Sequence, residues 1–279
     1  MPHLAKILIY PIKSLSGIEV TEARLLEGGA LAHDREFVMV DEQGRFVNGK
    51  RTAKVHLLRS TYDLANRGVT LEVQGDTQTA SFHLDDDRAA LETWLSEYFG
   101  YPVTLQQNLH MGFPDDTEAS GPTVVSTTTL ETIASWFPDL STDEIRHRFR
   151  ANLEIADVPA FWEDQLFGQA GELVPFQIGD VTLWGSHPCQ RCVVVTRDHL
   201  TGESYQGFQK AFTTQRKATL PSWANPSRFN HFYRLTLNTI VYPSEAGKVL
   251  RVGRDVNFPI CEESDRSSRR DGQDAHPTG

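Results

Sequence analysis

Six short apolar runs lie within the first 84 residues, and no other feature of the chain limits its fold as strongly. The runs cover residues 4–10, 18–26, 36–41, 55–62, 69–73 and 80–84, and turn residues such as Gly, Asp and Asn separate them. Short strands at this close spacing are typical of a β-barrel. We therefore predict a mostly β protein with α+β elements, which begins with a β-barrel-like domain.

Two helices are expected among the strands. Asp86 and Asp87 precede apolar residues spaced three and four apart, which predicts an amphipathic helix that ends at Gly100. The aromatic residues of this helix, Trp94 and Tyr98, are assigned to the core. A second helix is predicted to begin at Thr127. Later strands are predicted near residues 180–184, 192–196, 232–242 and 248–252.

The length and composition suit two domains. The chain has 279 residues, of which 39% are hydrophobic, and this is enough for a sizeable core. We place the first domain at residues 1–110 and the second at residues 123–261. Between them, residues 111–122 are rich in Gly, Pro and acidic side chains, and we expect a mobile connecting loop. Residues 262–279 are charge-rich and almost without apolar side chains, so they are expected to be disordered.

Charge and hydropathy exclude several classes of partner. The formal net charge of −10 argues against nucleic acid, because phosphate neutralisation requires a basic face. No apolar run approaches the roughly 18 residues that a membrane span needs, and the N-terminus does not resemble a secretory signal. With three cysteines and no disulfide framework, we expect a cytoplasmic protein.

The segment from His187 to Cys192 places two of the three cysteines in one loop. A Cys-x-x-Cys pair can form a disulfide, hold zinc or leave one thiolate free as a ligand. A four-thiolate zinc site lacks its second pair, although a mixed site with His187 stays open. A thioredoxin-like dithiol would precede a helix, whereas Val193–Thr196 predicts a strand. Two thiols without chemistry and a single-thiolate metal ligand are the other interpretations.

Further motifs accompany this loop in a fixed order along the chain. They are Tyr10–Gly17, Asp34–Phe37, Arg148–Leu153, Gln177–Asp180 and the Pro-Cys-Gln-Arg-Cys sequence at 188–192. With these motifs the chain resembles the MOSC proteins, in which an N-terminal β-barrel domain precedes the MOSC domain, over roughly residues 3–255. The pattern is most similar to the mitochondrial amidoxime-reducing components and their bacterial counterparts. Those proteins bind a molybdenum cofactor and reduce N-hydroxylated compounds.

The resemblance implies that Cys192 supplies the protein thiolate to molybdenum, with Cys189 as a supporting neighbour. A thiolate is the softest protein donor, and it suits a metal already held by the dithiolene sulfurs of the cofactor. Arg191 and local backbone amides would favour the deprotonated thiol.

The resemblance also implies a set of contacts to the phosphate and the pterin of the cofactor. Lys13 and Arg35 would suit the phosphate. We expect Arg150 and Asn152 to alternate on one face of a strand and to project together into a cleft. The candidate cofactor contacts are Lys13, Ser14, Arg35, Ser120, Arg150, Asn152 and Asn230.

Two regions depart from the pattern of the relatives. At Glu118–Pro122 only Ser120 carries over, and residues 204–228, with Phe208, Phe212 and Arg216, do not follow the relatives at all. We expect this second region to shape the mouth of a substrate site. Near its end, His231 is a candidate proton donor, because histidine titrates near neutrality and reduction of an N-oxygen consumes protons.

The sequence thus predicts a molybdenum-cofactor-dependent oxidoreductase that removes oxygen from N-hydroxylated amines, amidines or purines. The chain lacks the cysteines of an iron–sulfur cluster, so a separate flavoprotein, ferredoxin or cytochrome would supply electrons. One alternative is a cofactor carrier or a sulfur-handling MOSC module without reductase turnover. Another is a redox or zinc interaction module, in which Lys13, Arg35 and Arg150 would be dispensable.

Overall fold

The computed structural model describes residues 1–258 and contains fifteen β-strands and four α-helices in this range. The predicted mostly β class with α+β elements is confirmed. The predicted tail, residues 262–279, and Cys261 lie outside the described residues. No helix in residues 1–258 combines the length and the apolarity that a membrane crossing demands.

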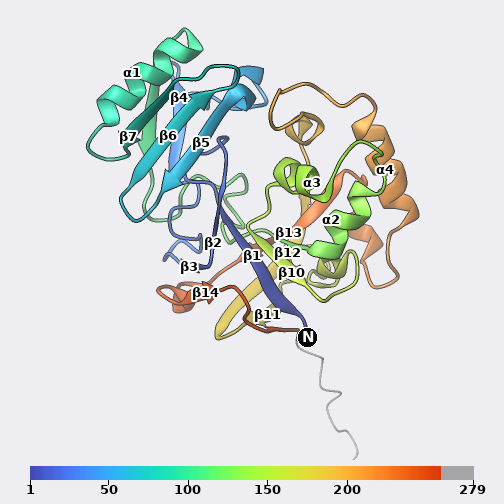
Figure 1. The fold of residues 1–279 in the computed structure, drawn as a ribbon. Helices are drawn as coiled ribbons and strands as arrows, with labels where there is room; N and C mark the ends of the chain where they lie inside the picture. Colours follow the sequence, from blue (N-terminus) through green and yellow to red (C-terminus); the bar gives the residue numbers. More distant parts are fainter. Residues whose placement is uncertain (259–279) are drawn as a thin grey trace, which may run out of the picture.

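An eight-stranded sheet forms the larger part of the molecule (Figure 1). Its central feature is β1 (His3–Ile9), which pairs antiparallel with β10 (Leu153–Ala156), so that Ile7 faces Leu153. The strand order is β15-β11-β12-β13-β9-β10-β1-β2. The remaining strands of this sheet are β2 (Ile18–Val20), β9 (Val124–Ser126), β11 (Val174–Ile178), β12 (Val181–Gln190), β13 (Arg234–Ile240) and β15 (Val256–Asn257).

The sheet curves into an open half-barrel, and backbone hydrogen bonds connect its β15 end to the start of β1. The backbone N–H of Leu4 donates to the Arg254 carbonyl at 2.9 Å, and the N–H of Val256 donates to the Pro2 carbonyl at 2.9 Å. The interior holds an apolar cluster that includes Leu4, Ile7, Leu153, Phe176 and Leu237. The first strand of the chain therefore belongs to the same sheet as residues 124–257. The domain limits at residues 110 and 123 stay a prediction.

A smaller β unit packs beside this sheet, at the upper left of Figure 1. It consists of a three-stranded sheet, a strand pair and a covering helix around one apolar core. The predicted helix is confirmed as α1, which ends at the left-handed Gly100 (φ 83°). The elements are β4 (Phe37–Asp41), η1 (Ala53–Leu57), β5 (Leu58–Asp63), β6 (Gly68–Val73), β7 (Thr79–His83), α1 (Arg88–Phe99) and β8 (Val103–Gln107). A further pair, β3 (Glu22–Arg24) with β14 (Val249–Arg251), joins two segments that are far apart in the sequence.

Three helices cover the other side of the large sheet: α2 (Thr127–Ala134), α3 (Thr142–Phe149) and α4 (Phe208–Ala218). Phe208, Phe212 and Arg216 recur every four residues, and all three are at most 1% exposed. This spacing places the three side chains on one buried helix face, so they line no surface, and a substrate mouth shaped by the rest of residues 204–228 stays a prediction.

A group of buried charges fixes α4 to the sheet. Arg216 is fully buried, pairs with Asp164 and stacks over the rings of Phe161 and Phe229, at 4.2 and 4.9 Å from their centroids. Glu163, beside Asp164 in η2 (Trp162–Gln165), is 1% exposed. Its carboxylate accepts from the Thr129 hydroxyl at 3.1 Å and from the backbone N–H of Ser126 at 3.3 Å. Burial, together with the charge of Asp164, raises the pKa of Glu163 to about 8.

The raised pKa of Glu163 predicts a pH-dependent stability. The folded protein keeps a proton on Glu163 that the unfolded chain loses above about pH 4.5, so this contribution is complete below that pH and is lost as the pH rises to 8. Glu163→Gln removes the titration. The free energy of unfolding of the wild type falls with pH in this range, and that of the variant does not. The difference, variant minus wild type, should therefore increase by about 1 kcal/mol per pH unit between pH 5 and 8.

Urea unfolding of both proteins across this pH range measures the difference. The exposed Glu131→Gln change on α2 is the control and should give a curve parallel to that of the wild type. Parallel curves for Glu163→Gln would contradict the proposed protonation of Glu163.

Candidate functional site

Two guanidinium groups share the ring of Tyr10, which directly follows β1. The Arg35 and Arg150 guanidinium carbons lie 5.0 and 4.0 Å from the ring centroid. Asp34 accepts a hydrogen bond of 2.9 Å from the Tyr10 backbone N–H and forms an ion pair with Arg35. The structure thus brings Arg35 and Arg150 together around one aromatic ring, although they are far apart in the sequence.

Arg150 does not lie on a strand, and the prediction of a shared strand face with Asn152 is wrong. It is the left-handed residue (φ 54°) that ends α3, and its N–H donates to the Arg146 carbonyl at 2.9 Å. The sequence from Phe149 to Ile155 has the alternation of apolar and polar residues that is typical of a strand. In the structure α3 ends at Phe149, and β10 begins only at Leu153. Among the described residues, the Arg150 guanidinium has no hydrogen bond and no ion pair. Burial lowers its pKa.

Asn152 is 2% exposed, and both ends of its amide are engaged by the protein. Its oxygen accepts from the Thr123 backbone N–H and hydroxyl, at 3.2 Å each, and from Arg35 at 3.4 Å. Its amide nitrogen donates to the Leu8 carbonyl at 3.0 Å. Asn152 therefore orients Arg35 and joins three segments.

Lys13 adds a third cation to this group. Its side chain is 10% exposed, and its ammonium donates to the carbonyls of Phe113 and Pro114 at 2.8 and 3.2 Å. The ammonium also pairs with Asp115 at 2.7 Å. Burial lowers the pKa of Lys13, and the pair with Asp115 opposes this effect. Although desolvation acts the other way, the charges of Lys13 and Arg35 hold the pKa of Asp115 well below its usual range.

Several residues of this cluster adopt left-handed backbone conformations that glycine favours. Ser14, Arg35 and Arg150 have φ values of 79°, 49° and 54°. Thr236, opposite the cysteine loop in β13, has φ 67° and is 2% exposed, which is rare for a β-branched residue. Backbone strain of this kind gathers at ligand clamps and active sites.

Cys189 and Cys192 are both half-buried free thiols. Cys189 is near the end of β12, where the pairing register with β13 shifts between Pro188 and Gln190. Cys192 precedes η3 (Val193–Thr196), a 3-10 helix. The prediction of a strand at residues 192–196 is therefore wrong. The β-branched run favoured a strand, but after Gln190 the chain leaves its partner β13, and a single helical turn satisfies the backbone instead.

Arg191 connects the cysteine loop to the turn of Arg150. Its guanidinium donates to the Phe149 carbonyl at 2.7 Å, to the Cys189 sulfur at 3.2 Å and to the Thr236 hydroxyl at 3.4 Å. Residues 150 and 192 are each adjacent in sequence to one end of this contact. The contact therefore links the two groups of candidate residues.

His187 is occupied and does not complete a metal site with the two cysteines. Its Nε2 lies 2.8 Å from Asp116 and 2.9 Å from the Asn238 amide, and its Nδ1 lies 2.9 Å from the Ser186 hydroxyl. These contacts, with the bond from Ser120 to the Gly28 carbonyl, anchor the connecting loop at residues 111–122. The loop is thus held against the body of the protein by side-chain contacts at Asp116 and Ser120.

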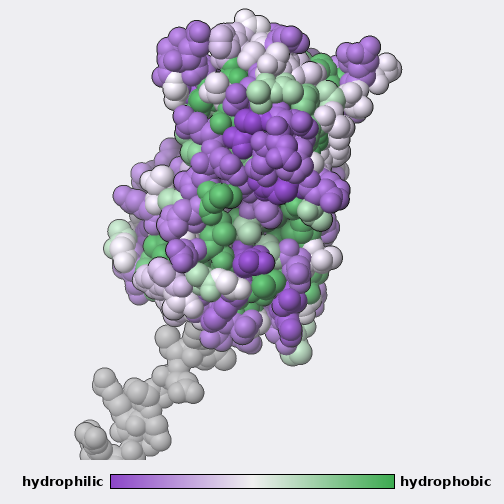
Figure 2. Space-filling model, turned by 90° about the vertical axis from the view of Figure 1, so that its left-hand side faces the viewer, coloured by the Kyte–Doolittle hydropathy of each residue, from purple (hydrophilic) through white to green (hydrophobic). Residues whose placement is uncertain are grey.

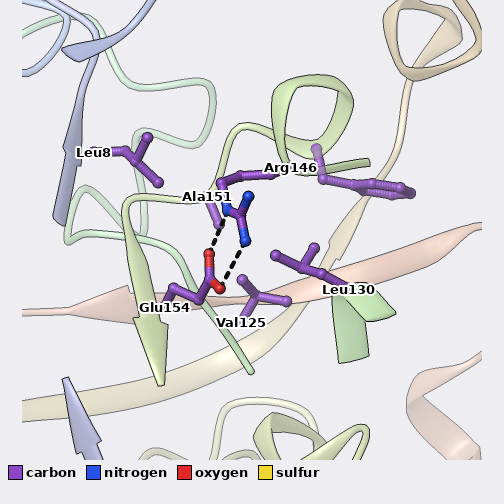
Figure 3. Close-up of a pocket in the computed structure, with 7 residues that line it drawn as sticks. Leu8, Val125, Leu130, Arg146, Ala151 and Glu154 are labelled. Carbon is purple, nitrogen blue, oxygen red and sulfur yellow. Dashed lines mark hydrogen bonds and ion pairs between the residues drawn. The ribbon is translucent and has the colours of Figure 1, made fainter. Parts of the chain in front are cut away.

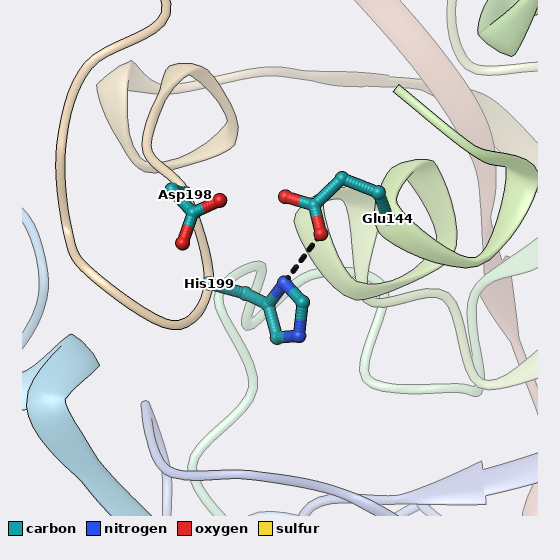
Figure 4. A group of neighbouring side chains, drawn as sticks. All are labelled: Glu144, Asp198 and His199. Carbon is teal, nitrogen blue, oxygen red and sulfur yellow. Dashed lines mark ion pairs between the residues drawn. The ribbon is translucent and has the colours of Figure 1, made fainter. Parts of the chain in front are cut away.

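Within residues 1–258, only Glu144, Asp198 and His199 approach one another closely enough to ligate one metal ion (Figure 4). Arg148 lies 2.9 Å from Glu144 and 3.7 Å from Asp198, so a guanidinium already balances both carboxylates. His199 pairs with Glu144 at 2.8 Å. This cluster ties the segment after η3 to α3, and thereby supports the position of Arg150.

An ion pair between α3 and β10 also stabilises the end of α3, where Arg150 lies. A bidentate ion pair joins Arg146 to Glu154, with N···O distances of 2.7 and 3.0 Å (Figure 3). The gap beside this pair, lined by Leu8, Val125 and Leu130 among others, does not admit a water molecule. It is a packing gap in the core and not a ligand site.

Asn230 and His231 lie where the chain enters β13. Asn230 accepts from Arg234 at 3.0 Å, and Arg234 donates to the Pro188 carbonyl at 3.0 Å, which places Asn230 next to the cysteine loop. Burial, with a further contribution from Arg234, lowers the pKa of His231.

Sequence reasoning missed Asp115, Asp116 and Thr123, because acidic and hydroxyl residues in a loop carry no distinguishing signal.

The position of Arg150 predicts a change that stabilises the fold but removes a charge from the site. Glycine is the usual residue at a left-handed helix end, and Arg150→Gly also removes an unpaired, partly buried cation. We expect the free energy of unfolding to rise by about 1 kcal/mol. Urea unfolding measures this rise.

Arg67→Gly is the matched control. Arg67 is also left-handed (φ 55°), but it pairs with Glu36 at 2.7 Å and with Asp85 at 2.8 Å, so its replacement should destabilise the protein. Equal losses in both variants would show that Arg150 stabilises the fold.

Two protein-family models match consecutive parts of this chain. The model of the MOSC N-terminal beta barrel domain matches residues 1–102, and the model of the MOSC domain matches residues 120–255. A molybdenum cofactor sulfurase of Drosophila mojavensis is 26% identical over 231 residues, which are 72% of this chain and 29% of that protein. The molybdenum cofactor sulfurase of Homo sapiens is 24% identical over 75% of this chain and 28% of its own length.

The chain thus spans less than a third of the length of these relatives. Among solved structures, the YUAD protein of Bacillus subtilis is similar with a TM-score of 0.38 and 10% identity, over 92% of this chain and 94% of that one. Because the two domain models follow each other and together cover most of the described residues, the chain belongs to the MOSC proteins that carry the N-terminal β-barrel domain.

Proposed function

We propose that this protein binds a molybdenum cofactor and reduces N-hydroxylated compounds, with electrons from a separate redox protein. The observation that carries the proposal is the Arg150 guanidinium, which has no hydrogen bond and no ion pair within residues 1–258. It shares the Tyr10 ring with Arg35, and Arg191 joins its turn to a loop with a free cysteine. A cation without a protein partner is costly to bury, and an anionic ligand would offset that cost.

The residues present fit the chemical groups of such a cofactor. Lys13, Arg35 and Arg150 would hold its phosphate, and Ser14 would add a hydroxyl donor. Cys192 would supply one soft thiolate. When bound, the cofactor supplies a metal centre that takes oxygen from an N–O bond and is returned to its reduced state by two electrons.

Other residues of the chain position these groups. Arg191 engages the sulfur of Cys189, which leaves the Cys192 thiol as the one without a side-chain partner among the described residues. Asn152 orients Arg35, and Arg234 ties Asn230 to the cysteine loop. His231 has an exposed edge and would deliver a proton to the departing oxygen.

The acidic character of the chain suits a basic electron donor, such as a flavoprotein, ferredoxin or cytochrome. Figure 2 shows hydrophilic side chains in a broad band across one face of the molecule. We further propose a cytoplasmic location, with neither nucleic acid nor membrane as a partner.

A second candidate is a sulfur-handling or cofactor-carrying MOSC module without reductase turnover. The names of the relatives, molybdenum cofactor sulfurases, favour it. It requires the same cofactor site but predicts that cofactor or sulfur passes to another protein.

The cofactor site predicts different outcomes for the two cysteines. In a host that makes the molybdenum cofactor, we expect near-stoichiometric molybdenum and pterin in the wild type. Cys192→Ala should lower the molybdenum content about tenfold or more, because it removes the only protein thiolate that would ligate the metal. Cys189→Ala is the matched control and should keep most of the metal. Elemental mass spectrometry and oxidised-pterin fluorescence provide the measurements.

Zinc in place of molybdenum, or neither metal nor pterin, would refute the cofactor site. If molybdenum is present, steady-state reduction of an aromatic amidoxime with a reduced dye separates the two candidates. Turnover supports the reductase. A loaded protein that gives no turnover but activates a cofactor-free acceptor enzyme supports the carrier.

His231 predicts the pH profile of the reductase. Because its pKa is lowered from the usual 6.5, the protonated form, and hence its contribution as a donor, is lost as the pH rises through the acidic range. We expect kcat of the wild type to fall already at pH values below 6.5, and the His231→Gln variant to show a flatter and lower profile. Identical profiles would mean that His231 does not donate the proton.

A further inference from the structure

The anion site of Lys13, Arg35 and Arg150 already contains one carboxylate, and this carboxylate is exposed. The Asp115 side chain is 72% exposed, whereas its partner Lys13 is 10% exposed. Arg35 is 13% exposed. The cations are therefore fixed in the protein, while Asp115 lies over them from the solvent side.

Asp34 is the second carboxylate of the cluster and plays a different part. It is 8% exposed, pairs with Arg35 and accepts from the Tyr10 backbone, so it belongs to the interior. The charge of Asp115, in contrast, acts on all three cations from one flexible loop side chain. Exposed Lys50 is a further positive group on the outer side of Asp115.

The charges of the cluster indicate which ligand it would take. Without the exposed Lys50, three cations face two carboxylates, so one positive charge is in excess while Asp115 is in place. If Asp115 moves away, the excess becomes two, which equals the charge of a fully ionised phosphate monoester. Lys13, Arg35 and Arg150, whose guanidinium has no hydrogen bond within residues 1–258, then offer the donors that such a group requires.

We propose that Asp115 occupies a phosphate site and is displaced when a phosphate monoester dianion binds. Asp116 stays bound to His187, and the Phe113 backbone N–H stays bound to the Arg35 carbonyl, so this movement concerns the exposed Asp115 side chain, which must leave its ion pair with Lys13. The inference rests on the anion site of the proposed function but needs no molybdenum. It assigns to Asp115 the role of a competitor for the phosphate group of the ligand.

Inorganic phosphate at pH 8 is the probe, with protein from a host that makes no molybdenum cofactor. Calorimetric titration should show that Asp115→Asn binds phosphate about fivefold more tightly than the wild type, the range expected for one exposed ion pair. Glu118→Gln removes the same charge from the same loop, but its side chain contacts no cation of the cluster, and it should change the affinity by less than about twofold. Lys13→Gln added to Asp115→Asn should abolish the gain.

A second measurement uses the wild type alone. Saturating phosphate should increase hydrogen exchange of the backbone amides at residues 113–118, because release of Asp115 removes one of the contacts that hold the loop. Equal or weaker phosphate binding by Asp115→Asn, no binding by any variant, or unchanged exchange would overturn the proposal. Tighter phosphate binding without molybdenum loading would leave this inference intact and refute the proposed function. Molybdenum loading without the phosphate effect would support the proposed cofactor site and overturn the inference on Asp115.

Discussion

The antiparallel pairing of β1 with β10 is the constraint on which the rest of the structure depends. It places the residues that follow β1 beside the residues that precede β10, so Tyr10 meets Arg150 and the Leu8 carbonyl meets Asn152. About 140 positions separate these partners in the sequence. Without the pairing, the cations of the site would belong to separate surface turns, where a charge is normally solvated.

The site is built on rigid elements and finished by loops. Arg150 ends a helix whose last turn is held by the Arg146–Glu154 pair, and the cysteine loop is bound to that helix through Arg191. The loop at residues 111–122 closes the arrangement with Asp115 over Lys13 and Asp116 against His187. Buried cations under an exposed carboxylate suit the proposed exchange of one anion for another.

The sequence could predict the elements whose signal is local. The apolar spacing of α1 and its stop at Gly100 need no distant partner, and the short strands of the first half follow from alternation and turn residues. Residues 192–196 show the limit of such reasoning, because a run of valines favours a strand only if a neighbouring strand is available. The helical spacing of Phe208, Phe212 and Arg216 was present in the sequence, but a buried arginine concealed it.

The sequence by itself determined the class of fold, the domain family and the residue types that a cofactor site requires. Only the tertiary structure decided how those residues are used: Asn152 is engaged within the protein, Arg150 has no hydrogen bond or ion pair within residues 1–258, and Asp115 pairs with Lys13. The physical reason is that hydrogen bonds and ion pairs saturate. Which polar group remains free for a ligand depends on every neighbour that the fold brings near, and spacing along the chain does not record those neighbours.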